Sequence, residues 1–429
     1  MQMKNKVKSE KGIMTMYVTV AVVTFTIILV ALFSLAVATR KNQIKTLIKI
    51  KEVYEQDNNK KEQIYLVKKE QIERQLPKTK YTIPYYPDNT FTKVADTNLD
   101  NGLVIQDANG NEYVWIEVPK SLYANSSYNT KTTTADKKPT KSTDYDKIEY
   151  CLNKYTDYYK DGCTDTYCSD EATGLTSAQY MKLKQKMLKS VYENGGFWIG
   201  RYEAGITTNR TAKGDVTVAP ISKAGTVDTP VYPYIYVTCS QAQTVANMLT
   251  TNVYTGSLMF GVQWDLVLKH IEVKEVAKGT AEATIKSALR NSKDWGNYPI
   301  SSFKIDRGKY AKFLSEGGTW KNFDTTLANC VTYANGISRK VSSNSFQNGI
   351  LLTTGASDTC KKMNIYDLAG NAMEWTLGYT GSSRQPCSCR GGSYASPSNG
   401  TGGAYRSANN GSNVMSNYGY IGFRVTLYK

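Results

Sequence analysis

The first hydrophobic feature of the chain is an unbroken apolar run near its start. Residues 13–39 carry no charged side chain and are rich in Val, Ile, Leu and Ala. A transmembrane helix needs about 20 such residues, so the sequence predicts one within residues 1–39, behind a basic N-terminus. A cleaved signal peptide is the alternative interpretation, with Ala36-Val37-Ala38 as its cleavage site.

The pattern after the apolar run is polar with widely spaced aliphatic residues. Ile and Leu recur at loosely helical spacing among Lys, Glu and Gln, which predicts a helical stalk over residues 40–80. Prolines then follow at Pro77, Pro84 and Pro87. Because proline interrupts helices and central strands, we interpret residues 81–99 as a linker.

Short strand signals begin near residue 100. Two β-rich runs, 103–106 and 113–116, flank Asn109-Gly110, a dipeptide typical of tight hairpin turns. Residues 197–203 predict a short buried strand. Between these signals, residues 120–175 form an insertion that opens with a Ser-, Thr-, Asn- and Lys-rich stretch.

Helical patterns are interspersed with the strands. Thr176 and Gln179 form a capping box that opens a predicted helix over residues 177–193. Apolar residues at helical spacing predict two more helices, around 242–249 and 264–271, and a further helix is expected near 306–315. Helices and strands mixed in this way predict an α+β domain with irregular loops over residues 100–429.

More than half of the net positive charge lies outside this domain. The chain has a formal net charge of +16, and its first 80 residues hold 16 Lys and Arg against 7 Asp and Glu. A nucleic-acid-binding domain would carry a basic stripe on its folded part. The distribution therefore argues against nucleic acid as a partner.

Metal and disulfide chemistry is only weakly indicated. The chain has 8 cysteines without a C-x-x-C pair and a single histidine, which argues against a mixed Cys/His zinc site. We expect a structural role for that histidine, His270, and assign no cofactor and no metal. If the chain is exported, we expect disulfides within the 151–168 loop, with the pairing left open.

The C-terminal stretch 390–429 has the most unusual composition. Of the 27 residues from Tyr394 to Tyr420, 22 are Ser, Asn, Gly, Tyr or Ala, and none is acidic or Lys. These types dominate antibody binding loops, where Tyr supplies contact area and small polar residues supply adaptable hydrogen bonds. A recognition surface and a merely solvated loop fit this composition equally well.

Three motifs carry a resemblance to a known family. They are the stretch from Asn364 to Thr376 (NIYDLAGNAMEWT), Arg390–Tyr394 (RGGSY) and Gly422–Arg424 (GFR). In this order they resemble the formylglycine-generating-enzyme-like, or sulfatase-modifying-factor, branch of the C-type lectin fold.

The resemblance implies this fold over residues 100–429 and gives several motif residues structural roles. Gly370-Asn371 would form a tight turn and Trp375 a buried plug. Arg390 and Arg424 would pair with carboxylates such as Glu374 or Glu203.

The chemistry of that family is not expected here. The resembled enzymes use two cysteines just upstream of a Tyr-Arg step, which corresponds to Tyr405-Arg406. Residues 397–404 contain no cysteine, and Cys387 and Cys389 precede Arg390 instead. Without a thiolate there is no redox nucleophile at the required place, so we predict no enzyme activity and no catalytic residue.

A second resemblance gives the C-terminal stretch a function. The variable proteins of diversity-generating retroelements use this scaffold and carry a mutable segment between an RGGS strand and a final GFR strand. This resemblance implies ligand binding by a diversified surface within a candidate variable region, 390–429. The predicted ligand-binding residues are Tyr394, Ser396, Ser398, Asn399, Thr401, Tyr405, Asn409, Asn410, Ser412, Asn413, Asn417, Tyr418 and Tyr420.

The N-terminus resembles type IV prepilin-like proteins, which are cut after a glycine such as Gly12. Tyr17 stands where that family usually has Glu. We therefore expect a membrane-anchored protein, held through residues 13–39, with an extracellular C-terminal domain. The expected partners are an external protein or glycan and, as candidates, pilus subunits. The alternatives are a formylglycine-generating-type oxidoreductase and a structural minor pilin.

Overall fold

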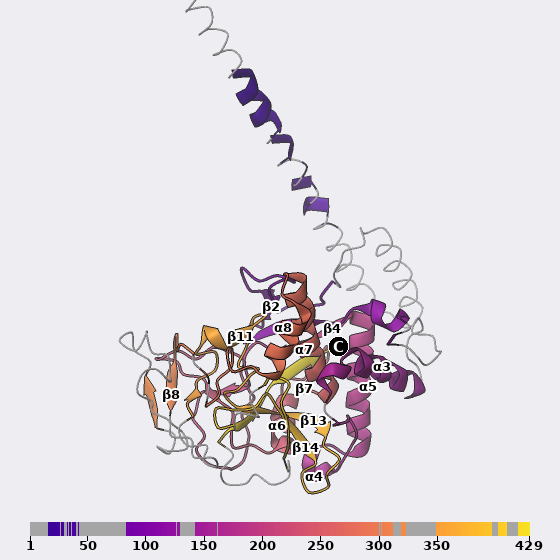
Figure 1. Cartoon of the computed structure of the whole chain (residues 1–429), viewed down its shortest axis with the longest axis vertical. Helices are drawn as coiled ribbons and strands as arrows, with labels where there is room; N and C mark the ends of the chain where they lie inside the picture. The colour runs from indigo at the N-terminus through magenta and orange to yellow at the C-terminus, as the bar shows by residue number, and fades with distance from the viewer. Residues whose placement is uncertain are drawn as a thin grey trace, which may run out of the picture. The chain divides into compact units, whose positions relative to one another are not determined.

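The structure, a computed structural model, divides into two compact units, residues 1–80 and 81–429 (Figure 1). The second unit contains the named helices and strands. The described residues are 16–25, scattered helical positions between 27 and 42, and 83–429 except 126, 129–141, 161, 300, 302, 312–318, 323–348, 397–401 and 410–418.

The predicted transmembrane helix is wrong. Across the described residues, no helix combines the length and apolar character needed to span a bilayer. Membrane anchoring through residues 13–39, and the localisation that depended on it, are corrected accordingly.

The larger sheet of the second unit has six strands in the order β1-β2-β3-β4-β17-β7. All of its pairings are antiparallel. β1 lies within residues 81–99, where the sequence predicted a linker. The strands are β1 (Thr92–Lys93), β2 (Val104–Gln106), β3 (Glu112–Glu117), β4 (Gly196–Gly200), β7 (Thr255–Leu258) and β17 (Val425–Tyr428).

A second sheet of four strands, ordered β15-β14-β13-β16, contains the sequence motifs. Its strands are β13 (Met373–Tyr379), β14 (Cys387–Arg390), β15 (Arg406–Asn409) and β16 (Ile421–Phe423). Three smaller sheets complete the described strands: β5 (Gly205–Ile206) with β6 (Tyr232–Pro233), β11 (Lys361–Lys362) with β12 (Ile365–Tyr366), and β10 (Leu351–Leu352), β8 (Lys309–Ala311) and β9 (Trp320–Asn322).

The described residues of the second unit include six α-helices. In Figure 1, α3 and α5 lie side by side along one edge of the unit, and β8 lies near the opposite edge. The helices are α3 (Ser142–Tyr155), α4 (Asp170–Thr173), α5 (Ser177–Asn194), α6 (Cys239–Asn247), α7 (Gly261–Ala277) and α8 (Glu282–Arg290). The predicted α+β class is confirmed.

Local sequence signals account for several of these elements. β2 and β3 pair as the predicted hairpin, and Gly110 adopts a φ of 75° in its turn. At α5, the backbone N–H of Gln179 donates to the Thr176 hydroxyl at 3.3 Å, and the Thr176 N–H donates to the Gln179 side chain at 2.8 Å. Thr238 and Gln241 form the same box at α6. Caps and apolar periodicity therefore predicted these elements correctly.

Two local predictions fail. The helix expected near 306–315 is absent from its described part, residues 306–311, which ends in strand β8. β8 pairs with β9 and β10, so long-range hydrogen bonding overrides the local preference. The 120–175 insertion also contains helices α3 and α4 rather than loop alone. The predicted stalk lies outside the described residues, apart from position 42.

One large hydrophobic core holds the unit together. Four tryptophans, Trp115, Trp198, Trp264 and Trp375, are at most 1% exposed and belong to the same cluster. They come from β3, β4, α7 and β13, so this core joins the two larger sheets and the central helix. The indole N–H of Trp375 donates to the Val237 carbonyl at 2.9 Å. Trp375 is therefore a buried plug, as the motif implied.

The capping box at α5 gives a direct test of the local folding code. We expect Thr176→Ala to lower the free energy of unfolding by about 1 kcal/mol, because the Gln179 N–H loses its acceptor. Ser177→Ala at the next position is the control and should change it by less than about 0.5 kcal/mol. Urea unfolding measures both. Equal midpoints for the two variants would contradict the assignment.

Candidate functional site

The predicted binding segment, residues 394–420, lies between two strands, β14 and β16, that pair with opposite sides of a third strand, β13. β14 pairs antiparallel with β13 on one side, and β16 pairs parallel with it on the other. After β14 the chain returns as β15, which pairs with β14 at the outer edge. β15 and β16 are therefore the two outer strands of this sheet. The two ends of the segment are fixed by ordered strands.

The first end of the segment is fixed by a buried ion pair. Arg390, the last residue of β14, donates from Nη2 to Asp265 Oδ1 at 2.7 Å. Both side chains are at most 2% exposed. The sequence suggested Glu374 or Glu203 as the partner of Arg390, and this is corrected. Asp265 lies on α7, 125 positions away, and no local signal connects the two.

The other end is fixed by Arg424, which lies between β16 and β17. Its Nε and Nη2 both donate to the Glu374 carboxylate, with the shortest distance at 2.6 Å. Nη1 donates to the Gly200 carbonyl at 2.9 Å, and Nη2 also donates to the Tyr366 carbonyl at 2.8 Å. The predicted Arg424–Glu374 pair is confirmed. The pair attaches the point where the chain passes from β16 to β17, between the two larger sheets, to β13 and to the end of β4.

A third attachment lies in the middle of the segment. The Trp264 indole donates to the Gly403 carbonyl at 2.8 Å, and the Gly403 N–H donates to the Ser292 hydroxyl at 2.9 Å. The Ala404 N–H donates to the Leu289 carbonyl at 3.0 Å. A Cβ on Gly402 would lie 2.2 Å from the Arg290 carbonyl oxygen, so this close approach requires glycine. These contacts all use the segment's backbone.

The predicted binding residues fall into distinct environments. Tyr394 and Ser396 are buried, and the Tyr394 hydroxyl donates to the Gly419 carbonyl at 3.3 Å, so these two side chains pack inside the unit. Tyr405 and Tyr420 are half-buried, and Asn409 ends β15. The remaining predicted positions lie outside the described residues: Ser398, Asn399, Thr401, Asn410, Ser412, Asn413, Asn417 and Tyr418.

A cluster of buried carboxylates includes Glu374 of β13. The cluster comprises Glu203, Asp367 and Glu374, which are each 1% exposed. Their carboxylates interact electrostatically with the Arg424 guanidinium. The Asn371 amide donates to Glu203 and accepts from the Leu352 N–H at 2.9 Å. Asn371 follows Gly370 in the turn predicted from the motif, and both residues have positive φ. The motif residues therefore build the frame of the segment.

One guanidinium cannot neutralise three carboxylates. Burial, together with the nearby Asp367, raises the pKa of Glu203 well above its usual value. Burial also raises the pKa of Asp367 from 3.8 to about 7 and raises the pKa of Glu374. Glu203 Oε2 and Asp367 Oδ1 are buried without a hydrogen-bond partner. The cluster therefore retains protons near neutral pH.

No metal centre emerges from the described part of the chain, which contains no group of three or more His, Cys, Asp or Glu arranged to hold an ion. His270 is buried, and its Nδ1 accepts a hydrogen bond from the Glu117 N–H at 3.2 Å. Burial lowers the pKa of His270 to about 3. It is a neutral hydrogen-bond acceptor between α7 and β3, the structural role expected from the sequence.

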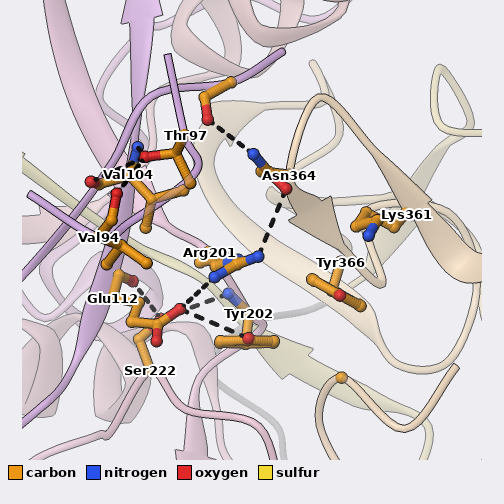
Figure 2. Close-up of polar contacts among 12 residues, drawn as sticks. Val94, Thr97, Val104, Glu112, Arg201, Tyr202, Ser222, Lys361, Asn364 and Tyr366 are labelled. Atoms are coloured by element: carbon orange, nitrogen blue, oxygen red, sulfur yellow. Dashed lines mark hydrogen bonds and ion pairs between the residues drawn. The ribbon is translucent and has the colours of Figure 1, made fainter. Parts of the chain in front are cut away.

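A second polar cluster surrounds Arg201 (Figure 2). Arg201 donates to Glu112 at 2.6 Å and to the Asn364 side chain at 3.4 Å. The rings of Tyr202 and Tyr366 stack with centroids 5.0 Å apart, and Arg201 lies 5.6 and 5.5 Å from their centroids. The cluster joins β3, the end of β4 and β12. Sequence reasoning missed Glu112, which is 89 positions from Arg201.

Comparisons with protein-family models, with curated proteins and with solved structures each gave no match.

The protons of the carboxylate cluster give a pH-dependent prediction. Because folding raises the pKa of Asp367 from 3.8 to about 7, the folded chain binds more protons than the unfolded chain in that window. The stability contribution is complete below pH 3.8 and is lost as the pH rises through 7. We expect Asp367→Asn to flatten this slope and to stabilise the chain at pH 8 by about 2 kcal/mol.

The measurement is urea unfolding between pH 5 and pH 8. Asparagine suits the site because it retains an acceptor for the Gly355 N–H and tolerates the φ of 56°. Asp228→Asn, at an exposed position, is the control and should leave the slope unchanged. A destabilised Asp367→Asn variant with the wild-type slope would show that Asp367 is ionised in the folded state.

Proposed function

We propose that this chain is a non-catalytic ligand-binding protein that contacts a protein or glycan through residues 394–420. The proposal includes a C-type lectin-like scaffold of the formylglycine-generating-enzyme type. It is supported by the sequence motifs, which lie where the segment enters and leaves the four-stranded sheet: RGGSY begins at the end of β14, and GFR includes the end of β16.

The observation that carries the proposal is how the segment is attached. The side chains that hold the segment lie outside residues 394–420; they are Arg390, Arg424, Trp264 and Ser292. Within the segment, the attachments described at Gly403 use its backbone N–H and carbonyl. Apart from Gly402, which requires glycine, side chains elsewhere in the segment can therefore change without removing these bonds. A binding surface whose side chains vary needs attachment bonds that do not depend on those side chains.

Composition supports the same conclusion. Tyrosine buries a large ring at the cost of two torsion angles, and Asn and Ser can donate or accept hydrogen bonds. The segment has no acidic residue and no Lys, so polar and aromatic contacts would dominate over ion pairs. Buried aromatic anchors provide most of the energy at such interfaces. Tyr405 and Tyr420 are the described, half-buried candidates for this role.

A binding experiment tests the proposal. The labelled full chain is applied to arrays of immobilised glycans and purified bacterial surface proteins, and affinity is measured for each hit. We expect the triple variant Asn410→Ala, Asn413→Ala and Asn417→Ala to bind at least tenfold more weakly, a change of about 1.4 kcal/mol.

The matched control replaces three exposed threonines outside the segment, Thr207, Thr208 and Thr211, with alanine. This variant should bind like the wild type. Equal affinity for the wild type and both variants, on every hit, would place the binding surface elsewhere.

Diversification has a genetic test. We expect the chromosomal locus to contain a near-identical repeat of the codons for 394–420, differing mainly at adenines, beside a reverse-transcriptase gene. Independent isolates should then differ in this window and agree in the codons for Arg390 and Arg424. Identical sequences for residues 394–420 in all isolates, together with the absence of a repeat, would reject diversification. The binding proposal would then be decided by the array measurements.

A further inference from the structure

Two cysteines from distant parts of the chain meet beside β14. Cys168 directly precedes Ser169, the N-cap residue of α4, and Cys387 is the first residue of β14. Both cysteines are reduced thiols in the structure, and a side-chain hydrogen bond with Cys387 is the main cause that raises the pKa of Cys168. The Cys387 thiol also donates to the carbonyl of Ala172, within α4, at 3.4 Å. Figure 1 shows α4 close to β14.

Backbone hydrogen bonds hold the segment before Cys168 against β13, and they do not involve the thiols. Thr164 forms an antiparallel bridge with Tyr379, through hydrogen bonds of 3.0 and 2.7 Å. Tyr379 in turn is the register partner of Cys387 across β13 and β14. The segment leading to Cys168 is therefore attached to β13, the strand that neighbours Cys387.

We infer that Cys168 and Cys387 form a disulfide under oxidising conditions, which cross-links the insertion to β14, the strand that precedes the candidate binding segment. The oxidant is a low-molecular-weight disulfide such as oxidised glutathione. The Cys168 thiolate attacks one glutathione sulfur and releases one glutathione thiolate. Cys387 then loses its proton and attacks the Cys168 sulfur of the mixed disulfide, which releases the second glutathione. Two protein thiols are oxidised and one glutathione disulfide is reduced to two thiols.

Accessibility sets the order of these steps. Cys168 is half-buried and Cys387 is 2% exposed, so only Cys168 is open to the external oxidant. The hydrogen bond to Cys387 and burial raise the pKa of Cys168, which keeps the thiolate scarce at neutral pH. Formation of the bond is therefore slow near pH 7 and accelerates at higher pH.

The cross-link would act on the frame of the proposed binding segment. It closes a loop of roughly 220 residues, and long loops lose the most chain entropy on cross-linking. It also attaches α4, a helix of only four residues, to the strand that ends at Arg390. The inference does not depend on ligand binding, because it concerns only the covalent state of the frame.

The experiment is peptide mapping of the full chain. The protein is incubated with oxidised glutathione at pH 8.5, free thiols are alkylated, and the digest is examined by mass spectrometry without reduction. We expect a peptide pair joined through Cys168 and Cys387. Cys168 recovered as a free thiol, as a stable glutathione adduct, or joined to another cysteine such as Cys163 or Cys389 would overturn the inference.

Thermal unfolding gives a second readout. We expect oxidation to raise the melting temperature of the wild type by about 5 °C. Cys168→Ser should abolish the shift, whereas Cys360→Ser, in a separate core cluster, should retain it. A shift that persists in Cys168→Ser would assign the stabilisation to another pair. If Cys360→Ser does not fold, the wild-type peptide map alone decides.

Discussion

The ion pair between Arg424 and Glu374 is the interaction on which the rest of the fold depends. Arg424 separates β16 from β17, so it marks the point where the chain leaves one larger sheet and enters the other. Its guanidinium bonds Glu374 and two backbone carbonyls, and both side chains are at most 1% exposed. A buried charge without its partner costs several kcal/mol. The pair therefore fixes the C-terminal strands relative to β13 and β4.

The same site explains why the motif residues are structural. Glu203 and Asp367 bring two further carboxylates to a place with one guanidinium, and burial raises the pKa of both. Asn371 bonds Glu203 and also accepts from the Leu352 backbone, so the turn, the cluster and β10 are linked. Buried polar networks of this kind specify one arrangement strongly, because each unmet group is costly. The motif residues are therefore also the residues that hold the two ends of the segment in place.

Local chemistry in the sequence accounts for much of this fold. The Asn109-Gly110 turn, the capping box at Thr176 and the apolar spacing of α6 and α7 each depend on residues a few positions apart, and each element forms as predicted. The failures have other causes. An apolar run predicted a membrane helix from composition alone, and strand β8 forms through partners outside its own window. The pairing of Arg390 with Asp265 also joins residues that are remote in sequence.

The candidate site shows the same division between local and long-range information. Composition singled out residues 394–420, but it could not separate Tyr394 and Ser396, which are buried, from half-buried Tyr405. That distinction arises from contacts with distant elements, such as the Gly419 carbonyl for Tyr394. Attachment at Gly403 uses backbone groups, while the adjacent Gly402 has no room for a side chain beside the Arg290 carbonyl. Because the buried charges that fix the two ends of the segment lie outside residues 394–420, changes to the segment's side chains leave both ion pairs intact.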